Sequence, residues 1–152
     1  MNPPVKTIVS HRFAFPAERV FDAWLDPEWI GRWMYGPGVR EERIVRLGLE
    51  PRVGGRFSFV VDRQGTEVDH IGEYLEIDRP RLLVFTWATR DSLPDTSRVI
   101  VEFSPCAGGC ELTLTHVMAA KWAPFADKAA GAWRNMLGAL DRALGPQPSL
   151  LK

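Results

Sequence analysis

The segment from residue 56 to residue 144 constrains the fold most, because several strand-like stretches with alternating apolar side chains lead into one long amphipathic helix. Alternate residues of a strand face the same side of a sheet. Large rings fall on one parity and are expected to face inward: Phe57, Phe59, His70, Tyr74, Phe85, Trp87, Phe103 and His116. We therefore predict a curved sheet packed against the helix, around an interior of aromatic rings with a few polar groups.

Short turns join the strand-like stretches, which we place at residues 56–62, 67–77, 82–89, 98–103 and 111–118. Antiparallel neighbours need only such turns, whereas parallel neighbours need a crossover of about a dozen or more residues. The pattern predicts an antiparallel meander. Residues 39–50 are extended but rich in charge, and we expect them to form an edge strand with a solvated face, since charge discourages pairing with other chains.

The N-terminal part predicts a strand over residues 7–15 and then two short helices. Pro16 suits the opening turn of the first helix, Asp26 is a plausible N-cap of the second, and Pro27 fits its first position. Apolar side chains recur at helical spacing along both segments: Val20, Phe21, Trp24, Leu25, Trp29, Ile30, Trp33 and Met34. The second helix should stop at Gly36.

The last part of the chain predicts one long helix with Pro124 in its first turn. Its apolar stripe consists of Phe125, Ala129, Trp133, Met136, Leu137, Leu140 and Leu144. Charged residues occupy the opposite face, so one side must be buried against a broad surface, and the sheet is the only candidate. The fold class that follows is α+β.

Length and charge exclude several classes of function. The 152 residues contain no linker or repeat, which predicts a single domain over 1–152. Nineteen basic residues balance nineteen acidic ones without a long basic run, so we do not expect nucleic-acid binding. We also expect no membrane span, because no stretch approaches about 20 apolar residues, and a cytoplasmic location, because the first residues do not resemble a secretory signal.

Cys106 and Cys110 flank a predicted hairpin turn. In a reducing compartment we expect two free thiols. Two cysteines without a neighbouring histidine or acidic cluster cannot complete a tetrahedral zinc site, and the sequence shows no phosphate-binding glycine loop or serine-centred elbow. We assign no metal, no cofactor and no catalytic residue.

Several short motifs occur in an order typical of one family. They are His11-Arg12-Phe13, residues 17–24, Asp26-Pro27-Glu28, residues 33–37, 53–57, 70–77, 83–87, 112–116 and 133–140. Through them the chain resembles, over residues 7–144, the small bacterial proteins related to the C-terminal domain of the activator of the ninety-kilodalton heat-shock chaperone's ATPase. These belong to the START-like, polyketide-cyclase-like (SRPBCC) superfamily.

The resemblance implies a helix-grip fold, in which an antiparallel sheet curves around a long C-terminal helix and two short helices follow the first strand. It also implies a cavity between sheet and helix. The family usually has glycine directly before the tryptophan of the final helix, whereas this chain has Ala132 before Trp133. The added methyl group should alter the shape of the cavity.

We expect the cavity to bind a small hydrophobic or aromatic ligand. Its predicted lining is Trp29, Trp33, Phe57, Phe59, His70, Tyr74, Phe85, Trp87, Val101, His116, Met118, Trp133, Met136 and Leu137. Each of these residues can instead serve only as core, and His70 and His116 as hydrogen-bonded structural histidines.

Two other functions stay open at this point. The resemblance allows stimulation of a heat-shock chaperone ATPase, with the chaperone as partner. It also allows a cyclase- or hydrolase-like enzyme acting on an aromatic or polyketide-like substrate, with His70 or His116 as base and Tyr74 as hydrogen-bond donor. General acid–base catalysis needs a group that orients the base, and the strand carboxylates mostly fall on the outward parity, so we rank binding first.

Overall fold

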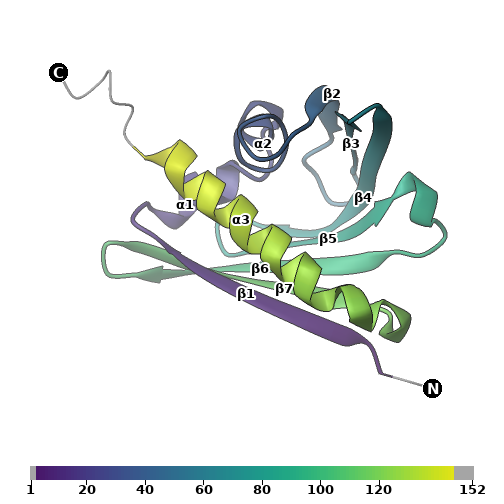
Figure 1. Ribbon diagram of the computed structural model, residues 1–152. Helices are drawn as coiled ribbons and strands as arrows, with labels where there is room; N and C mark the ends of the chain where they lie inside the picture. The colour runs from purple at the N-terminus through teal and green to yellow at the C-terminus, as the bar shows by residue number, and fades with distance from the viewer. Residues whose placement is uncertain (1–2, 146–152) are drawn as a thin grey trace.

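A seven-stranded antiparallel sheet curves around one long helix in the computed structural model, which describes residues 3–145 (Figure 1). The elements in chain order are β1 (Val5–Phe13), α1 (Ala17–Asp22), α2 (Pro27–Trp33), β2 (Arg43–Leu49), β3 (Arg56–Arg63), β4 (Thr66–Asp78), β5 (Leu82–Thr89), a 3₁₀ helix (Arg90–Ser92), β6 (Ser97–Cys106), β7 (Gly109–Met118), a second 3₁₀ helix (Ala120–Phe125) and α3 (Ala126–Leu144). This arrangement confirms the predicted α+β helix-grip fold.

The strand order is β1-β7-β6-β5-β4-β3-β2, so β2 to β7 form the predicted antiparallel meander and β1 pairs with β7. The charged stretch does contribute an edge strand, β2, but the strand begins only at Arg43. One part of that prediction is wrong: Glu42, expected on a solvated face, is buried. Its carboxylate lies between arginines that the fold supplies from both sides.

Side chains on the predicted inner parity face the interior. Phe57, Phe59 and Tyr74 are each at most 4% exposed, and both His70 and His116 are buried. The pairing of β6 with β7 places Val101 opposite Leu114, and both are fully buried. The hydrophobic alternation of the sequence thus decides which face of the sheet meets the helix.

The two short helices begin where the sequence predicts. Pro16 is the N-cap of α1, and the Asp26 carboxylate accepts a hydrogen bond from the Glu28 backbone N–H at 3.0 Å, with Pro27 as the first residue of α2. The helices pack Val20, Phe21, Trp24, Ile30 and Trp33 into the core. In Figure 1 they cover one end of the concave face, beside the C-terminal half of α3.

The start of the final helix differs from the prediction. Pro124 and Phe125 belong to the preceding 3₁₀ helix, and α3 begins at Ala126. Phe125 is 50% exposed and packs against Trp122, with 5.5 Å between ring centroids. As the N-cap residue it precedes the α-helical periodicity, so it does not share the stripe that buries Trp133, Met136, Leu137, Leu140 and Leu144.

The β6–β7 hairpin turns at Ala107 and Gly108, where Gly108 has a φ of +82° that favours glycine. Cys106 and Cys110 are free thiols on either side of this turn. Burial raises the pKa of the Cys110 thiol, which therefore stays protonated at neutral pH. None of the helices within residues 3–145 is long and apolar enough to cross a membrane.

Candidate functional site

The space between the sheet and the helices consists of a closed part and an open part. The closed part is enclosed by Trp24, Met34, Phe57, Phe59, Tyr74, Leu83, Phe85 and Trp87. Only about 10 Å³ of free space remains among them. That is at most room for one water molecule, so these rings form a packed core.

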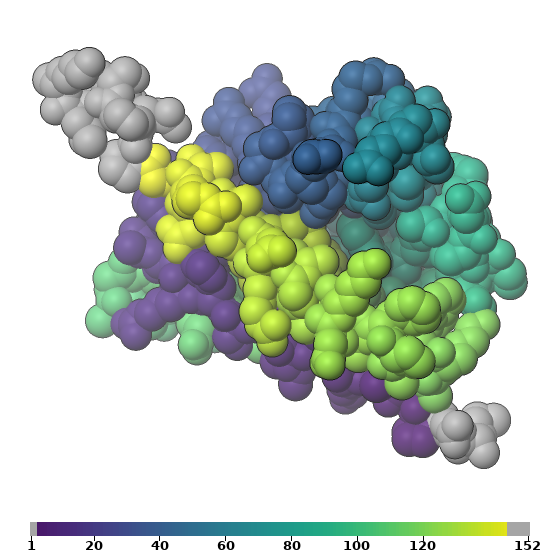
Figure 2. Space-filling model, viewed as in Figure 1, coloured from purple at the N-terminus to yellow at the C-terminus, as the bar shows by residue number. Residues whose placement is uncertain are grey.

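The open part is a cavity of about 440 Å³ along the N-terminal half of α3. Its lining consists of Tyr35, Arg40, Arg63, His70, Trp87, Thr89, His116, Lys128, Ala129, Ala132, Trp133 and Met136. Figure 2 shows a recess between the yellow-green helix and the blue and teal segments across from it, with teal atoms at its floor. A volume of this size is within the usual range for small-molecule sites, about 300–1,000 Å³.

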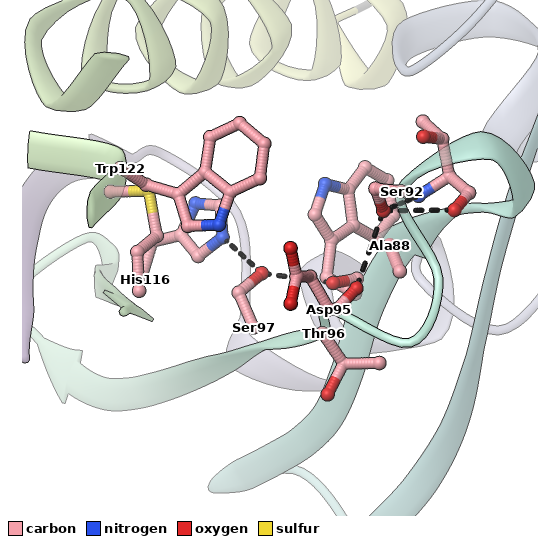
Figure 3. A pocket seen from close by; sticks show the side chains of 10 residues that line it. Ala88, Ser92, Asp95, Thr96, Ser97, His116 and Trp122 are labelled. Carbon is pink, nitrogen blue, oxygen red and sulfur yellow. Dashed lines mark hydrogen bonds between the residues drawn. The ribbon is translucent and has the colours of Figure 1, made fainter. Parts of the chain in front are cut away.

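A second, smaller hollow of about 220 Å³ shares Trp87, Thr89 and His116 with this cavity (Figure 3). Its other walls come from the loop between β5 and β6 and from Trp122 of the second 3₁₀ helix. Trp87 and His116 therefore separate two adjoining hollows at the same end of the molecule.

His116 is held at both ring nitrogens. The indole N–H of Trp133 donates to His116 Nδ1 at 3.2 Å, and His116 Nε2 is 2.7 Å from Ser97 Oγ, as Figure 3 shows for the second bond. Since an indole N–H can only donate, Nδ1 must be the unprotonated nitrogen and Nε2 carries the proton. Ser97 Oγ then accepts from the ring and donates its own proton to the Trp87 carbonyl at 2.9 Å.

This chain of hydrogen bonds has a chemical consequence. A histidine that activates a serine must accept the hydroxyl proton, but here the ring nitrogen facing Ser97 is already protonated. Burial also lowers the pKa of His116 from 6.5 to about 4. The Ser97–His116 pair is therefore a structural element that orients Trp133 and not a nucleophile with its base.

One of the two ring nitrogens of His70 makes a hydrogen bond. Its Nδ1 lies 3.2 Å from the Phe59 carbonyl, which accepts a hydrogen bond from it, and the Nε2 atom makes no hydrogen bond within residues 3–145. Burial is the main cause that lowers the pKa of His70 from 6.5 to about 4, and the nearby Arg63 lowers it further. A neutral imidazole with a free acceptor can bind a ligand hydroxyl or amide, but it is a weak base at neutral pH.

Tyr35 follows α2 and lines the cavity beside His70, with 4.8 Å between the ring centroids. Its hydroxyl is buried and has no hydrogen-bond partner within the described part of the chain. Burial raises the pKa of this hydroxyl well above its usual value, so it stays protonated. A buried hydroxyl without a partner is costly and marks a place where a bound molecule or water can supply one.

Charged side chains gather at one side of the cavity. Glu42 accepts from Arg63 Nε at 2.7 Å, from Arg40 Nη1 at 3.0 Å and from the Gly36 backbone N–H at 2.8 Å. Its carboxylate is fully buried, whereas the side chains of Arg40 and Arg63 are 27% and 36% exposed. One carboxylate thus fixes two guanidinium groups at the cavity wall.

The fourteen predicted lining residues take different places. His70, Trp87, His116, Trp133 and Met136 line the open cavity. Met118 lines the smaller hollow. The remaining eight lie elsewhere: Phe57, Phe59, Tyr74 and Phe85 enclose the packed core, Trp33, Val101 and Leu137 are fully buried, and Trp29 is half-buried with the Arg32 guanidinium 4.8 Å from its ring centroid.

The lining predicted from the sequence lacks seven residues of the cavity wall: Tyr35, Arg40, Arg63, Thr89, Lys128, Ala129 and Ala132. Tyr35 follows the predicted helix directly, and an aromatic residue next to a helix stop is a weak signal of burial. The three cations resemble ordinary surface residues in the sequence, and only their positions in space bring them together.

Comparison with known proteins agrees with this architecture. Protein CV1439 from Chromobacterium violaceum has a TM-score of 0.80 at 22% identity, covering 93% of this chain and 98% of that chain. Protein NE0264 from Nitrosomonas europaea has a TM-score of 0.77 at 17% identity, with coverage of 91% and 92%. CalU16 from Micromonospora echinospora has a TM-score of 0.71 at 23% identity, with coverage of 97% and 80%.

These similarities establish the fold alone, and no curated protein sequence matches the chain significantly. A family model does match: the model for activator of Hsp90 ATPase homolog 1-like proteins aligns with residues 14–145. That span includes all three α-helices, six of the seven strands and the whole lining of the cavity. The chain therefore belongs to the activator of Hsp90 ATPase homolog 1-like family.

Proposed function

We propose that this protein binds a small hydrophobic or aromatic molecule in the 440 Å³ cavity beside α3. The observation that carries the proposal is the combination of free volume with an aromatic wall: Trp87 is half-buried, and the buried Trp133 lies behind it with 5.3 Å between the ring centroids. Flat aromatic surfaces of this kind gain free energy by excluding water when an apolar molecule covers them.

The polar groups of the cavity suit recognition better than catalysis. The proton on His116 Nε2 and the low pKa of His70 leave neither ring as an effective base near neutral pH. The Nε2 atom of His70, which makes no hydrogen bond within residues 3–145, can instead satisfy one polar group of a ligand. The Tyr35 hydroxyl is shielded from solvent behind the cavity wall. These features rank binding above a cyclase- or hydrolase-like reaction.

Fluorescence titration with the neutral dye N-phenyl-1-naphthylamine tests the proposal, since its emission rises in an apolar environment. We expect saturable binding of one dye per protein. The variant Ala132→Phe should abolish it, because Ala132 lies on the cavity wall and a ring there occupies the space. Ala123→Phe adds the same ring at an exposed position and should bind as the wild type does.

If the dye fails to bind the wild type, or binds Ala132→Phe equally well, the cavity is not the binding site and the proposal is wrong. Native mass spectrometry of the freshly purified protein gives an independent measurement. A copurified small molecule in the wild type that Ala132→Phe lacks would support the same conclusion.

A further inference from the structure

We infer that the ligand is an amphipathic organic anion, with an apolar or aromatic body against Trp87 and Trp133 and one negatively charged group, such as a carboxylate, at Arg40, Arg63 and Lys128. The inference rests on the proposed function, because it names the ligand class of the same cavity. It follows from the charges on the cavity wall and from the donors that remain free there.

The cavity wall is strongly asymmetric in charge although the chain as a whole is neutral. Three of its twelve lining residues are cations, and none is an aspartate or glutamate. Glu42, behind the wall, offsets them, and the nearby Asp69 carboxylate, which also acts on Tyr35, is itself paired with Arg90. One carboxylate against Arg40, Arg63 and Lys128 leaves two positive charges in excess, and a low-dielectric cleft concentrates such a field.

The arginines keep hydrogen-bonding capacity for a ligand. A guanidinium group carries five N–H donors. Across residues 3–145, Arg63 uses only its Nε, and Arg40 uses only Nη1, which is shared between Glu42 and the Met34 carbonyl. Glu42 therefore holds the two side chains in place while their remaining donors stay available, which is the arrangement that carboxylate recognition requires.

Lys128 adds a third cation from the opposite side of the cavity. It lies in the first turn of α3, where the helix dipole favours anions and gives a lysine no stabilisation. Its ammonium group makes no ion pair within residues 3–145. The positive end of the helix itself adds to the potential there. An anion between Lys128 and the arginines would interact favourably with all of these groups.

The rest of the wall fits the other end of such a molecule. Trp133 and Met136 are buried apolar side chains of α3, and Ala129 and Ala132 leave space beside them because they are small. The apolar part of the wall thus lies on α3, with Lys128 at its N-terminal end and the two arginines across the cavity. An apolar stretch bordered by cations selects a molecule with one charged group and one apolar body over a purely hydrocarbon ligand or a small inorganic ion.

A pair of dyes that differ in one charged group tests the inference. The anion 8-anilinonaphthalene-1-sulfonate is N-phenyl-1-naphthylamine with an added sulfonate. Removal of one cation near the bound group should weaken the sulfonate dye about threefold to tenfold. We therefore expect Lys128→Gln to weaken the sulfonate dye by this factor, and by more than it weakens the neutral dye. Arg134→Gln, on the exposed face of the same helix, is the matched control and should change neither affinity.

Salt provides a second measurement. Raising sodium chloride from 50 to 500 mM should weaken the sulfonate dye and not the neutral dye, because screening acts on the charged group alone. If the neutral dye binds at the cavity but Lys128→Gln and salt leave the sulfonate dye unaffected, the ligand class inferred here is wrong while the cavity function stands. If neither dye binds the wild type, the proposed function fails and the inference fails with it.

Discussion

The two halves of α3 face the same sheet, yet one half builds a packed core and the other walls a cavity. The C-terminal half places Leu137, Leu140 and Leu144 against the sheet, and all three are at most 1% exposed. The N-terminal half places Ala129 and Ala132 there instead. Each half of the helix carries both large and small side chains, with Trp133 and Met136 beside the cavity and Ala139 in the core. The small side chains of Ala129 and Ala132 contribute to the open space, and the segments across from them do not fill it.

Polar groups follow the same division. Around the open half lie His70, His116, Tyr35 and the arginines fixed by Glu42. In the closed half, the buried side chains of α3 are all apolar: Leu137, Ala139, Leu140 and Leu144. Effects on stability and effects on binding must therefore be measured separately to test this comparison, beginning with the single side chains that contribute most to the free energy of unfolding.

Leu140→Ala removes a fully buried side chain from the closed half. We expect it to lower the free energy of unfolding by about 2–5 kcal/mol, the usual cost of such a cavity. Urea denaturation measures the loss. The affinity for the neutral dye should stay within about twofold of the wild type while the variant is folded. A large drop in affinity would show that the two halves of the interface are not independent.

Acid should destabilise the protein by protonating the two histidines beside the cavity, His70 and His116. Burial lowers the pKa of His70 and of His116 from 6.5 to about 4. Between these two pH values both histidines are neutral in the folded protein, whereas in the unfolded chain they are protonated. The stability is present above pH 6.5 and is lost as the pH falls towards 4, by about 3 kcal/mol for each histidine. Urea denaturation between pH 7 and 4 measures this loss.

The variants His70→Gln and His116→Gln provide the control for the pH dependence. Each variant should lack the contribution of its histidine to the pH dependence of the free energy of unfolding between pH 6.5 and 4. A glutamine at position 116 can still accept a hydrogen bond from Trp133 and donate one to Ser97. An unchanged slope in both variants would assign the acid sensitivity to other groups.

Glu42→Gln should lower the stability of the protein and raise its affinity for the sulfonate dye. Loss of the buried carboxylate weakens its bonds to Arg40 and Arg63, and because those side chains are partly exposed we expect a modest loss of about 1–2 kcal/mol. The same change raises the net positive charge of the cavity wall. The sulfonate dye should therefore bind about threefold tighter at low salt, although the protein is less stable and a glutamine holds the two arginines less firmly. Weaker binding of that dye, with a salt dependence no steeper than in the wild type, would contradict the charge argument.

Ala132→Phe should have the smallest effect on stability, within about 1 kcal/mol of the wild type, since its ring enters free space. Ala139→Phe is the matched variant in the closed half, where Ala139 is 6% exposed. There the same ring must displace packed neighbours, and a loss of about 1–3 kcal/mol or more is expected. Equal thermal midpoints for the two variants would show that the two halves do not differ in packing.

Local patterns in the sequence were enough to predict most of the fold. Alternation placed Phe57, His70 and His116 on the inner face, and Asp26-Pro27 marked the start of α2, because both signals depend on neighbouring residues. Phe125 was assigned wrongly to the helical stripe, since the tighter 3₁₀ turn before α3 depends on how that segment packs.

Local patterns could not predict which part of the interior is packed and which part is open. Whether Phe57 and Phe85 line a cavity or a core depends on Trp24 and Met34, which reach them from the segments just after α1 and α2, far away in the chain. Glu42 looks like its charged neighbours, and its burial depends on Arg63 of another strand. Contacts between distant segments have no local signature, and the candidate site is made of such contacts.

The pairing of the first strand with the last has a consequence for biosynthesis. Val5 pairs with Met118 and Phe13 with Cys110, so β1 leaves the ribosome long before its partner exists. Until β7 is made, the inward-facing Val9 and Phe13 lack the sheet that buries them. The helix that completes the cavity is translated later still. The proposed binding can therefore begin only after α3 has been translated, and the nascent chain is exposed to aggregation until then.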